Sequence, residues 1–168
     1  SFIITGSEVL DNRSAEEKDA GLRTFHLKSI ISDEEAEFKK FIGTLEKKSQ
    51  KLVPRPLALE NALKATNGMV LRVEGLNEAP IYIENQISIS EDNKFLRNFV
   101  KLEQGSSLTI VETGNNSFAK NIMSEFSISK GAKLNYINLT NFNNKSPNIG
   151  HIFCDLEEGA KFNYLSLN

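Results

Sequence analysis

The stretch Val100-Lys-Leu-Glu-Gln-Gly105-Ser-Ser-Leu-Thr-Ile110 decides the fold, because two later segments repeat its pattern around Gly131 and Gly159. In each copy, apolar or small residues stand five and three positions before the glycine and one, three and five positions after it. These residues are Val100, Leu102, Ser106, Leu108 and Ile110, then Phe126, Ile128, Ala132, Leu134 and Tyr136, then Cys154, Leu156, Ala160, Phe162 and Tyr164. All stand at odd offsets, so in an extended chain they lie on one face. Each copy is therefore predicted to be a strand, a tight glycine corner and a second strand.

The spacing of the copies predicts a stacked array. The three glycines are 26 and 28 residues apart, a period typical of solenoids and other repeat folds. One unit cannot bury its apolar face alone, so neighbouring units must cover it. A first, imperfect copy opens at Val70–Gly75 and continues at Pro80–Ile83. We predict a mainly β protein with a parallel β-helix of irregular two-strand coils over residues 68–168. A β-sandwich with hairpins at the glycine corners is the alternative.

Residues 1–67 are predicted to form a small α+β segment. Apolar residues around a turn predict a hairpin over residues 2–10, and Phe25 with Leu27 marks another short extended piece. Ser32–Glu35 has the spacing of a capping box, which predicts that a helix begins at Ser32. The apolar residues that follow at helical spacing are Phe38, Phe41, Ile42 and Leu45. Pro56 suits the first turn of a second helix over about residues 56–66, and we expect helix only between residues 32 and 67.

Composition excludes several classes of protein. The 168 residues carry a formal net charge of -2, so no basic excess points to nucleic acid or to an anionic membrane surface. A single cysteine, no apolar run of membrane-spanning length and no signal peptide favour a reducing, cytoplasmic location. The chain starts at Ser1 rather than Met and ends on an apolar repeat at Asn168. We therefore expect it to be a piece of a longer protein.

The sequence contains no motif that identifies a reaction. It has no phosphate-binding glycine loop, no dinucleotide fingerprint, no paired-cysteine zinc motif and no nucleophile elbow. The acidic pairs Glu91–Asp92 and Glu157–Glu158 fall in predicted turns, where solvated charge is the usual explanation. We assign no catalytic residue and expect a structural or binding role rather than an enzyme.

His151 and Cys154 are the only candidates for metal ligands, and both are weak. Alternation along a strand places them on opposite faces. Cys154 stands at the repeat position of Val100 and Phe126, so we expect a buried core thiol. His151 is expected to be an ordinary surface histidine, and His26 has no partner cluster in the sequence. The aromatic stripe is interpreted as stacked core, and its members are Phe126, Tyr136, Phe162 and Tyr164.

The stretch Pro56–Ile83 resembles the SufD family of SUF-system Fe–S cluster assembly proteins. The resemblance rests on Leu59-Glu-Asn-Ala-Leu63, Asn67-Gly68, Val70-Leu-Arg-Val73 and Ala79-Pro-Ile81. The later Phe99-Val-Lys-Leu-Glu-Gln-Gly-Ser and Phe153-Cys-Asp-Leu-Glu-Glu-Gly-Ala are similar to the recurrent coils of that family. The paralogue SufB shares the same fold, but this sequence lacks its cysteine-bearing segments, which favours SufD.

This resemblance implies a right-handed parallel β-helix in a non-catalytic scaffold subunit that acts with SufB and the ATPase SufC. It implies an Fe–S cluster held transiently by the whole complex, with no cofactor in this fragment. The chain ends at Asn168, before the coils that carry the family's histidine near SufB and before the region that engages SufC. We therefore carry over no functional residue. We expect the fragment to fold without binding SufC and to self-associate through its open C-terminal coil.

Three alternatives remain open. A carbohydrate-active β-helix enzyme requires aligned acidic or basic residues on the outward face of successive coils, whereas the outward positions here are mixed. The second alternative is the paralogous scaffold SufB. The third alternative is a surface adhesin built from a β-solenoid. The absence of an export signal in the sequence argues against it.

Overall fold

The computed structural model describes residues 1–5, 9–13, 21–32, 39–77, 79–85, 95–114, 121–139 and 149–167. The N-terminal elements are β1 (Phe2–Ile4), β2 (Val9–Asp11), β3 (Leu22–His26), α2 (Leu27–Ser32), α4 (Thr44–Leu52) and α5 (Pro56–Lys64). The strands that follow are β4 (Met69–Val73), β5 (Ile81–Asn85), β6 (Phe95–Leu102), β7 (Ser107–Gly114), β8 (Asn121–Ile128), β9 (Lys133–Asn138), β10 (Ile149–Leu156) and β11 (Lys161–Ser166). None of the helices in these ranges has the length and apolar character needed to cross a membrane.

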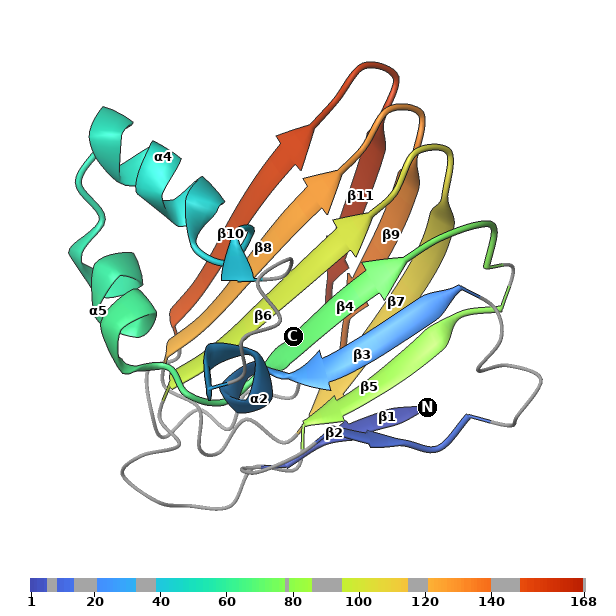
Figure 1. Cartoon of the computed structure of the whole chain (residues 1–168), viewed down its shortest axis with the longest axis horizontal. Helices are drawn as coiled ribbons and strands as arrows, with labels where there is room; N and C mark the ends of the chain where they lie inside the picture. Colours follow the sequence, from blue (N-terminus) through green and yellow to red (C-terminus); the bar gives the residue numbers. More distant parts are fainter. Residues whose placement is uncertain are drawn as a thin grey trace.

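Two sheets face each other, and successive strands of the C-terminal part alternate between them (Figure 1). One sheet has the order β11-β9-β7-β5-β1-β2, and the other has the order β10-β8-β6-β4-β3. Strands β4, β6, β8 and β10 pair in parallel within one sheet, and strands β5, β7, β9 and β11 pair in parallel within the other. The N-terminal strand β1 also pairs in parallel with β5, whereas β1–β2 and β3–β4 are antiparallel. The expected mainly β fold with parallel stacking is confirmed.

The strand register reproduces the sequence repeat. Phe126 pairs with Val100 on one side and with Cys154 on the other, and Tyr136 pairs with Ile110 and Tyr164. The strands that flank Gly105, β6 and β7, belong to different sheets. The same holds at the other two glycine corners, so the alternative with antiparallel hairpins at these corners is wrong.

Each corner is a β-turn that only glycine closes without strain. At the first corner the Ser106 N–H donates to the Glu103 carbonyl at 3.1 Å, and Gly105 has φ 69°. A positive φ at the third turn position is typical of a type II turn and favours glycine. The corners also bond to one another, because the Gly105 N–H donates to the Lys130 carbonyl at 3.0 Å. Turn geometry and stacking therefore reinforce each other.

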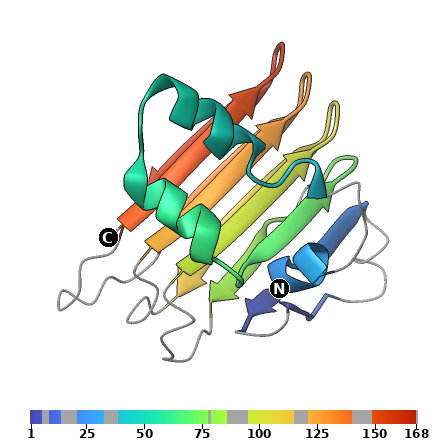
Figure 2. The same cartoon turned by 60° about the vertical axis from the view of Figure 1, so that its left-hand side comes forward.

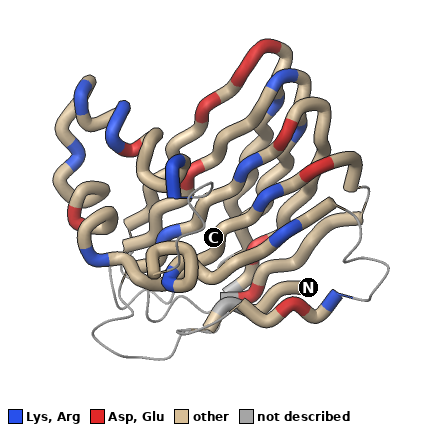
Figure 3. Tube along the Cα trace, viewed as in Figure 1, with Lys and Arg blue, Asp and Glu red and all other residues tan. Residues whose placement is uncertain are grey.

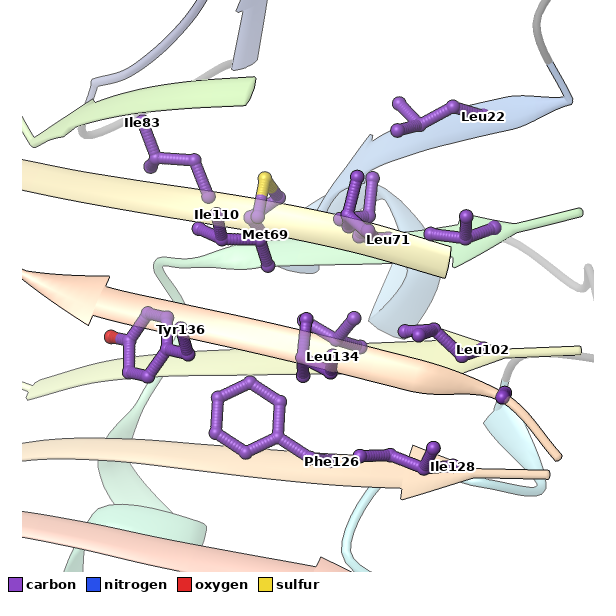
Figure 4. Packing of buried hydrophobic residues seen from close by; sticks show 14 of the residues in the cluster. Leu22, Met69, Leu71, Ile83, Leu102, Ile110, Phe126, Ile128, Leu134 and Tyr136 are labelled. Atoms are coloured by element: carbon purple, nitrogen blue, oxygen red, sulfur yellow. The ribbon is translucent and has the colours of Figure 1, made fainter. Parts of the chain in front are cut away.

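The predicted inward face forms the main core between the two sheets (Figure 4). Phe126 is 1% exposed, and Tyr136 and Leu134 are buried beside it. The ring centroids of Phe126 and Tyr136 lie 5.1 Å apart at a tilt of 56°, a favourable aromatic geometry. The prediction of a stacked aromatic core is confirmed for this pair. Phe162 is only partly buried, and the prediction is wrong for Tyr164, which is exposed on the edge strand β11.

Helices α4 and α5 lie across the outer face of the five-stranded sheet (Figure 2). The predicted second helix is confirmed, with Pro56 in its first turn and its end at Lys64. Ala58 and Asn61 face the sheet and are fully buried. The Asn61 side-chain Nδ2 donates to the Leu96 carbonyl at 3.1 Å and to the Asn121 carbonyl at 2.9 Å. These bonds fix α5 on two neighbouring strands.

The N-terminal hairpin is confirmed, and the extended piece is confirmed at Phe25 but not at Leu27, which begins helix α2. The first helix also differs from the prediction. Ser32 is the last residue of α2 instead of a helix start, and its hydroxyl donates to the Lys28 carbonyl at 2.8 Å. Helix therefore begins earlier than residue 32, at Leu27. The physical reason is tertiary packing. Leu27 and Ile30 lie about one helical turn apart on one face of α2, and this face is buried against Val70 and Phe99. Residues 33–38, which hold most of the predicted capping box, lie outside the described residues.

Candidate functional site

A buried polar pair, Tyr136 and Glu112, lies between the two sheets. The Tyr136 hydroxyl donates a hydrogen bond to the Glu112 carboxylate, and both side chains are buried. Tyr136 stands five residues after Gly131, and Glu112 stands seven residues after Gly105. Glu112 therefore lies on the inward face by the same alternation that defines the core. The sequence analysis missed Glu112, although its odd offset was the signal that could have found it.

Burial raises the pKa of Tyr136 well above its usual value, and the negative charge of Glu112 and the hydrogen bond to it act in the same direction. A weaker effect of the Ser124 side chain lowers it. The phenol therefore remains protonated and remains a donor throughout the physiological pH range. This pair satisfies a carboxylate inside an apolar core, where an unpaired charge is costly.

A cavity of about 330 Å³ lies beside this pair, between the ends of the strands that are remote from the glycine corners. Its lining consists of Ile122, Ser124, Tyr136, Asn138, Ile149, Gly150, His151, Ile152, Tyr164 and Ser166. The polar residues of the lining, which come from both sheets, carry hydroxyls, one amide and the single imidazole of His151. They offer hydrogen bonds to a small polar group rather than a set of strong metal ligands.

His151 lies on the outer face of β10, as alternation predicts, but it is half-buried. Its ring stacks on Phe153 with centroids 6.4 Å apart, and its Nε2 has no hydrogen-bond partner among the described residues. Burial lowers the pKa of His151, and the nearby Arg55 guanidinium lowers it further. The imidazole is therefore neutral at neutral pH.

Cys154 occupies the inward repeat position in register with Phe126, but it is exposed. The expectation of a buried core thiol is wrong here, because β10 is an edge strand among the described residues and no further strand pairs with it there. Partial burial, followed by the neighbouring Asp155 charge, raises the pKa of the thiol to about 11. Because the thiolate is the metal-binding form, this environment disfavours ligation at neutral pH.

The structure does not bring His151 and Cys154 into one site. They face opposite sides of β10, and the described residues contain no group of three or more His, Cys, Asp or Glu side chains placed to hold a metal ion. His26 is buried, and its Nδ1 accepts from the Lys28 N–H at 3.1 Å. Glu157 and Glu158 sit at a corner and bind the Lys130 N–H and ammonium. Glu91 and Asp92 lie outside the described residues.

A buried ion pair beneath the helices was also missed by the sequence analysis. Glu125 of β8 is 0% exposed and Arg97 of β6 is 6% exposed. The Arg97 guanidinium donates to Glu125 Oε1 through Nη2 at 2.6 Å and through Nε at 3.0 Å. Both residues stand at outward positions, which alternation alone assigns to solvent. No local signal predicts that α4 and α5 cover them.

The same carboxylate caps helix α4 from outside the helix. The Gly43 N–H donates to Glu125 Oε1 at 3.2 Å, and the Glu46 N–H donates to Oε2 at 3.4 Å. Gly43, the N-cap residue, provides no side-chain hydrogen bond of its own and has φ 80°. A carboxylate at a helix N-terminus satisfies free N–H groups and interacts favourably with the helix dipole. Glu125 therefore fixes the helical layer to the sheet.

A family model described as SUF system FeS cluster assembly, SufBD core domain, matches residues 85–168, half of the chain. The matched residues include strands β6 to β11 and all three glycine corners of the repeat. A search of curated proteins gave no match to the chain.

Proposed function

This chain belongs to the SUF-system SufB/SufD family of Fe–S cluster assembly proteins, and we propose that within it the chain is a scaffold subunit of the SufD type. Its proposed role is to hold partner subunits, not to catalyse a reaction. The Fe–S cluster is then the cargo of the whole assembly rather than a resident cofactor of this chain.

The observation that carries the proposal is the in-register stack of glycine-cornered units inside the matched region. Backbone bonds link the corners from unit to unit, as when the Gly131 N–H donates to the Glu158 carbonyl at 3.0 Å. A stack of this kind is rigid and extended, as a platform for other subunits requires. We propose that the two sheets are walls of one right-handed parallel β-helix, since each unit gives one strand to each sheet.

The finer assignment to SufD rests on the step from helix α5 into strand β4. Pro56–Lys64 leads through Asn67-Gly68 into Met69–Val73, the order in which the sequence resembles SufD. The proposed partners are SufB and the ATPase SufC, and the proposed location is the cytoplasm. His151 and Cys154 remain weak candidates for metal ligands and have no part in this proposal.

Co-expression of the chain with SufB tests this function. We expect a complex with SufB that survives size-exclusion chromatography, and we expect Phe126→Ala to reduce its yield by disturbing the platform. Lys161→Ala, at an exposed position on β11, is the matched control and should leave the yield unchanged. Failure of the folded chain to associate with SufB, together with binding or cleavage of polysaccharide, would favour the carbohydrate-active alternative.

A further inference from the structure

A groove runs between helices α4 and α5, and Arg97 of strand β6 also contributes to its lining. Most of the lining surface is apolar, although charged side chains take part in it. It has a volume of about 600 Å³. Leu59 and Leu63 line it one helical turn apart, 46% and 78% exposed, with Ala62 and Ile42 beside them. Grouped exposed leucines of this kind mark interaction sites in soluble proteins.

The helical layer around the groove is strongly basic, although the whole chain is slightly acidic. Residues 39–64 include seven lysines and arginines but only two glutamates, whereas the chain has a net charge of -2 (Figure 3). Lys47 and Lys51 line the groove on α4. Among the described residues neither ammonium has an ion-pair partner, whereas the neighbouring Lys48 binds Asp155 at 3.3 Å. The groove therefore has two unpaired positive charges on its rim.

The floor of the groove contains an acceptor without a donor. Glu46 lines the groove and is 2% exposed, and its Oε1 has no hydrogen-bond partner among the described residues. A buried carboxylate oxygen without a partner is costly and rare in native proteins. An N–H or O–H group of an occupant would satisfy this oxygen once a small shift of the Glu46 side chain brings it to the groove surface. The unsatisfied oxygen of Glu46 therefore favours an occupant of the groove that carries a hydrogen-bond donor.

We propose that the α4–α5 groove binds an acidic amphipathic helix of a partner protein. Its leucine-type residues would pack on Leu59 and Leu63, its carboxylates would pair with Lys47 and Lys51, and a polar donor would reach Glu46. Each groove helix has nine residues, so the site is about 13 Å long and accepts about two to three helical turns. A helix laid in a groove is a common mode of peptide recognition. This site lies on the outer helical layer and is independent of the proposed scaffold role.

The concave shape favours a protein helix over an anionic membrane. A membrane-binding surface inserts a convex apolar face into the lipid, whereas Leu59 and Leu63 line a hollow that has a buried acceptor at its floor. Charge complementarity also gives the interaction a predicted salt dependence, because exposed lysines on the rim are screened by added ions.

Fluorescence anisotropy with the 168-residue chain tests the proposal. The probe is a labelled synthetic peptide with leucines at helical spacing and glutamates on both flanks. Its controls are the same peptide with lysines in place of the glutamates and a scrambled acidic peptide. We expect saturable binding of the acidic helical peptide only, with an affinity that falls as salt is added. Binding of the lysine or scrambled peptide with equal affinity, or no binding of any peptide, would overturn the proposal.

Paired charge reversals locate the binding site. Lys47→Glu with Lys51→Glu should weaken the acidic peptide about tenfold or more. Lys133→Glu with Lys161→Glu is the matched control, because these two exposed lysines are neighbours on the uncovered sheet, and it should change the affinity less than twofold. Leu63→Ser should weaken binding without loss of fold, which circular dichroism checks. Equal effects of the two double variants would refute the site.

Binding of the chain to phosphatidylglycerol vesicles is measured to distinguish a lipid-binding surface from a groove that binds a protein helix. If they bind the chain in a manner that depends on Lys47 and Lys51 while the acidic peptide does not, the surface is a lipid-binding surface and the proposal is wrong. Peptide binding without vesicle binding supports the helix groove.

Discussion

Replacing Glu125 by alanine should be among the most destabilising single changes in the chain. The carboxylate is fully buried and accepts two bonds from the Arg97 guanidinium and two from backbone N–H groups at the start of α4. Its removal leaves a buried guanidinium without a counter-ion and the first turn of α4 without a cap. Breaking a buried ion pair costs about 3–5 kcal/mol. Loss of a helix cap costs about 1 kcal/mol alone, but the two contributions share one carboxylate and do not add fully.

Urea denaturation measures this cost as the change in free energy of unfolding at constant m-value. Glu158→Ala is the matched control, because Glu158 pairs with Lys130 at a similar distance, 2.6 Å, but at the surface. That pair should contribute no more than about 1 kcal/mol. Replacing both partners, Arg97→Met with Glu125→Leu, should recover much of the loss, since matched apolar replacements of buried pairs are often tolerated.

Two further measurements check the role of Glu125 in holding α4. Hydrogen exchange should show the α4 amides losing protection in Glu125→Ala before the strand amides do. If Glu125→Ala does not fold, the double replacement still tests the idea, because it should fold. A cost for Glu125→Ala no larger than that of Glu158→Ala would refute the claim that this carboxylate holds the helical layer.

Three further predictions concern the core, the corners and the thiol. Phe126→Ala should lower the free energy of unfolding by about 3–5 kcal/mol, because Phe126 is 1% exposed and packs against Tyr136 and Phe162. An unchanged midpoint of thermal unfolding would contradict this prediction. Gly131→Ala should lower the free energy of unfolding by about 1–2 kcal/mol, because the backbone φ at this position is 67°. The added Cβ itself would meet no atom within 4 Å. Gly150→Ala is the control, since φ at Gly150 is not positive and the space is also open, and it should be nearly neutral. The pKa of Cys154 is raised from 9.0 to about 11, so the folded state retains a proton that the unfolded state loses between those values. Alkylation of Cys154 by iodoacetamide should therefore rise with pH about a midpoint near 11, and this thiol should reduce stability as pH increases through that window; a midpoint at or below 9 would show that the thiol is not shielded.

The sequence by itself determined the repeat and everything that follows from its alternation. The odd offsets from Gly105, Gly131 and Gly159 gave the inward residues, and the strand register pairs those positions from unit to unit. This works because the two-residue period of a strand is a local property of the backbone. The second helix was also predictable, since Pro56 marks its start and its apolar residues repeat at helical spacing.

Only the tertiary structure decided which outward residues are buried and which inward residues are exposed. Arg97 and Glu125 stand at outward positions, yet α4 and α5 cover them, whereas Cys154 stands at an inward position on an edge strand and is exposed. Likewise, Ser32 ends a helix because Leu27 and Ile30 pack against distant strands, despite a local pattern that predicts a helix start. In each case the outcome depends on contacts between segments far apart in the chain. Alternation fixes the direction of a side chain, but only the packed structure fixes what lies above it.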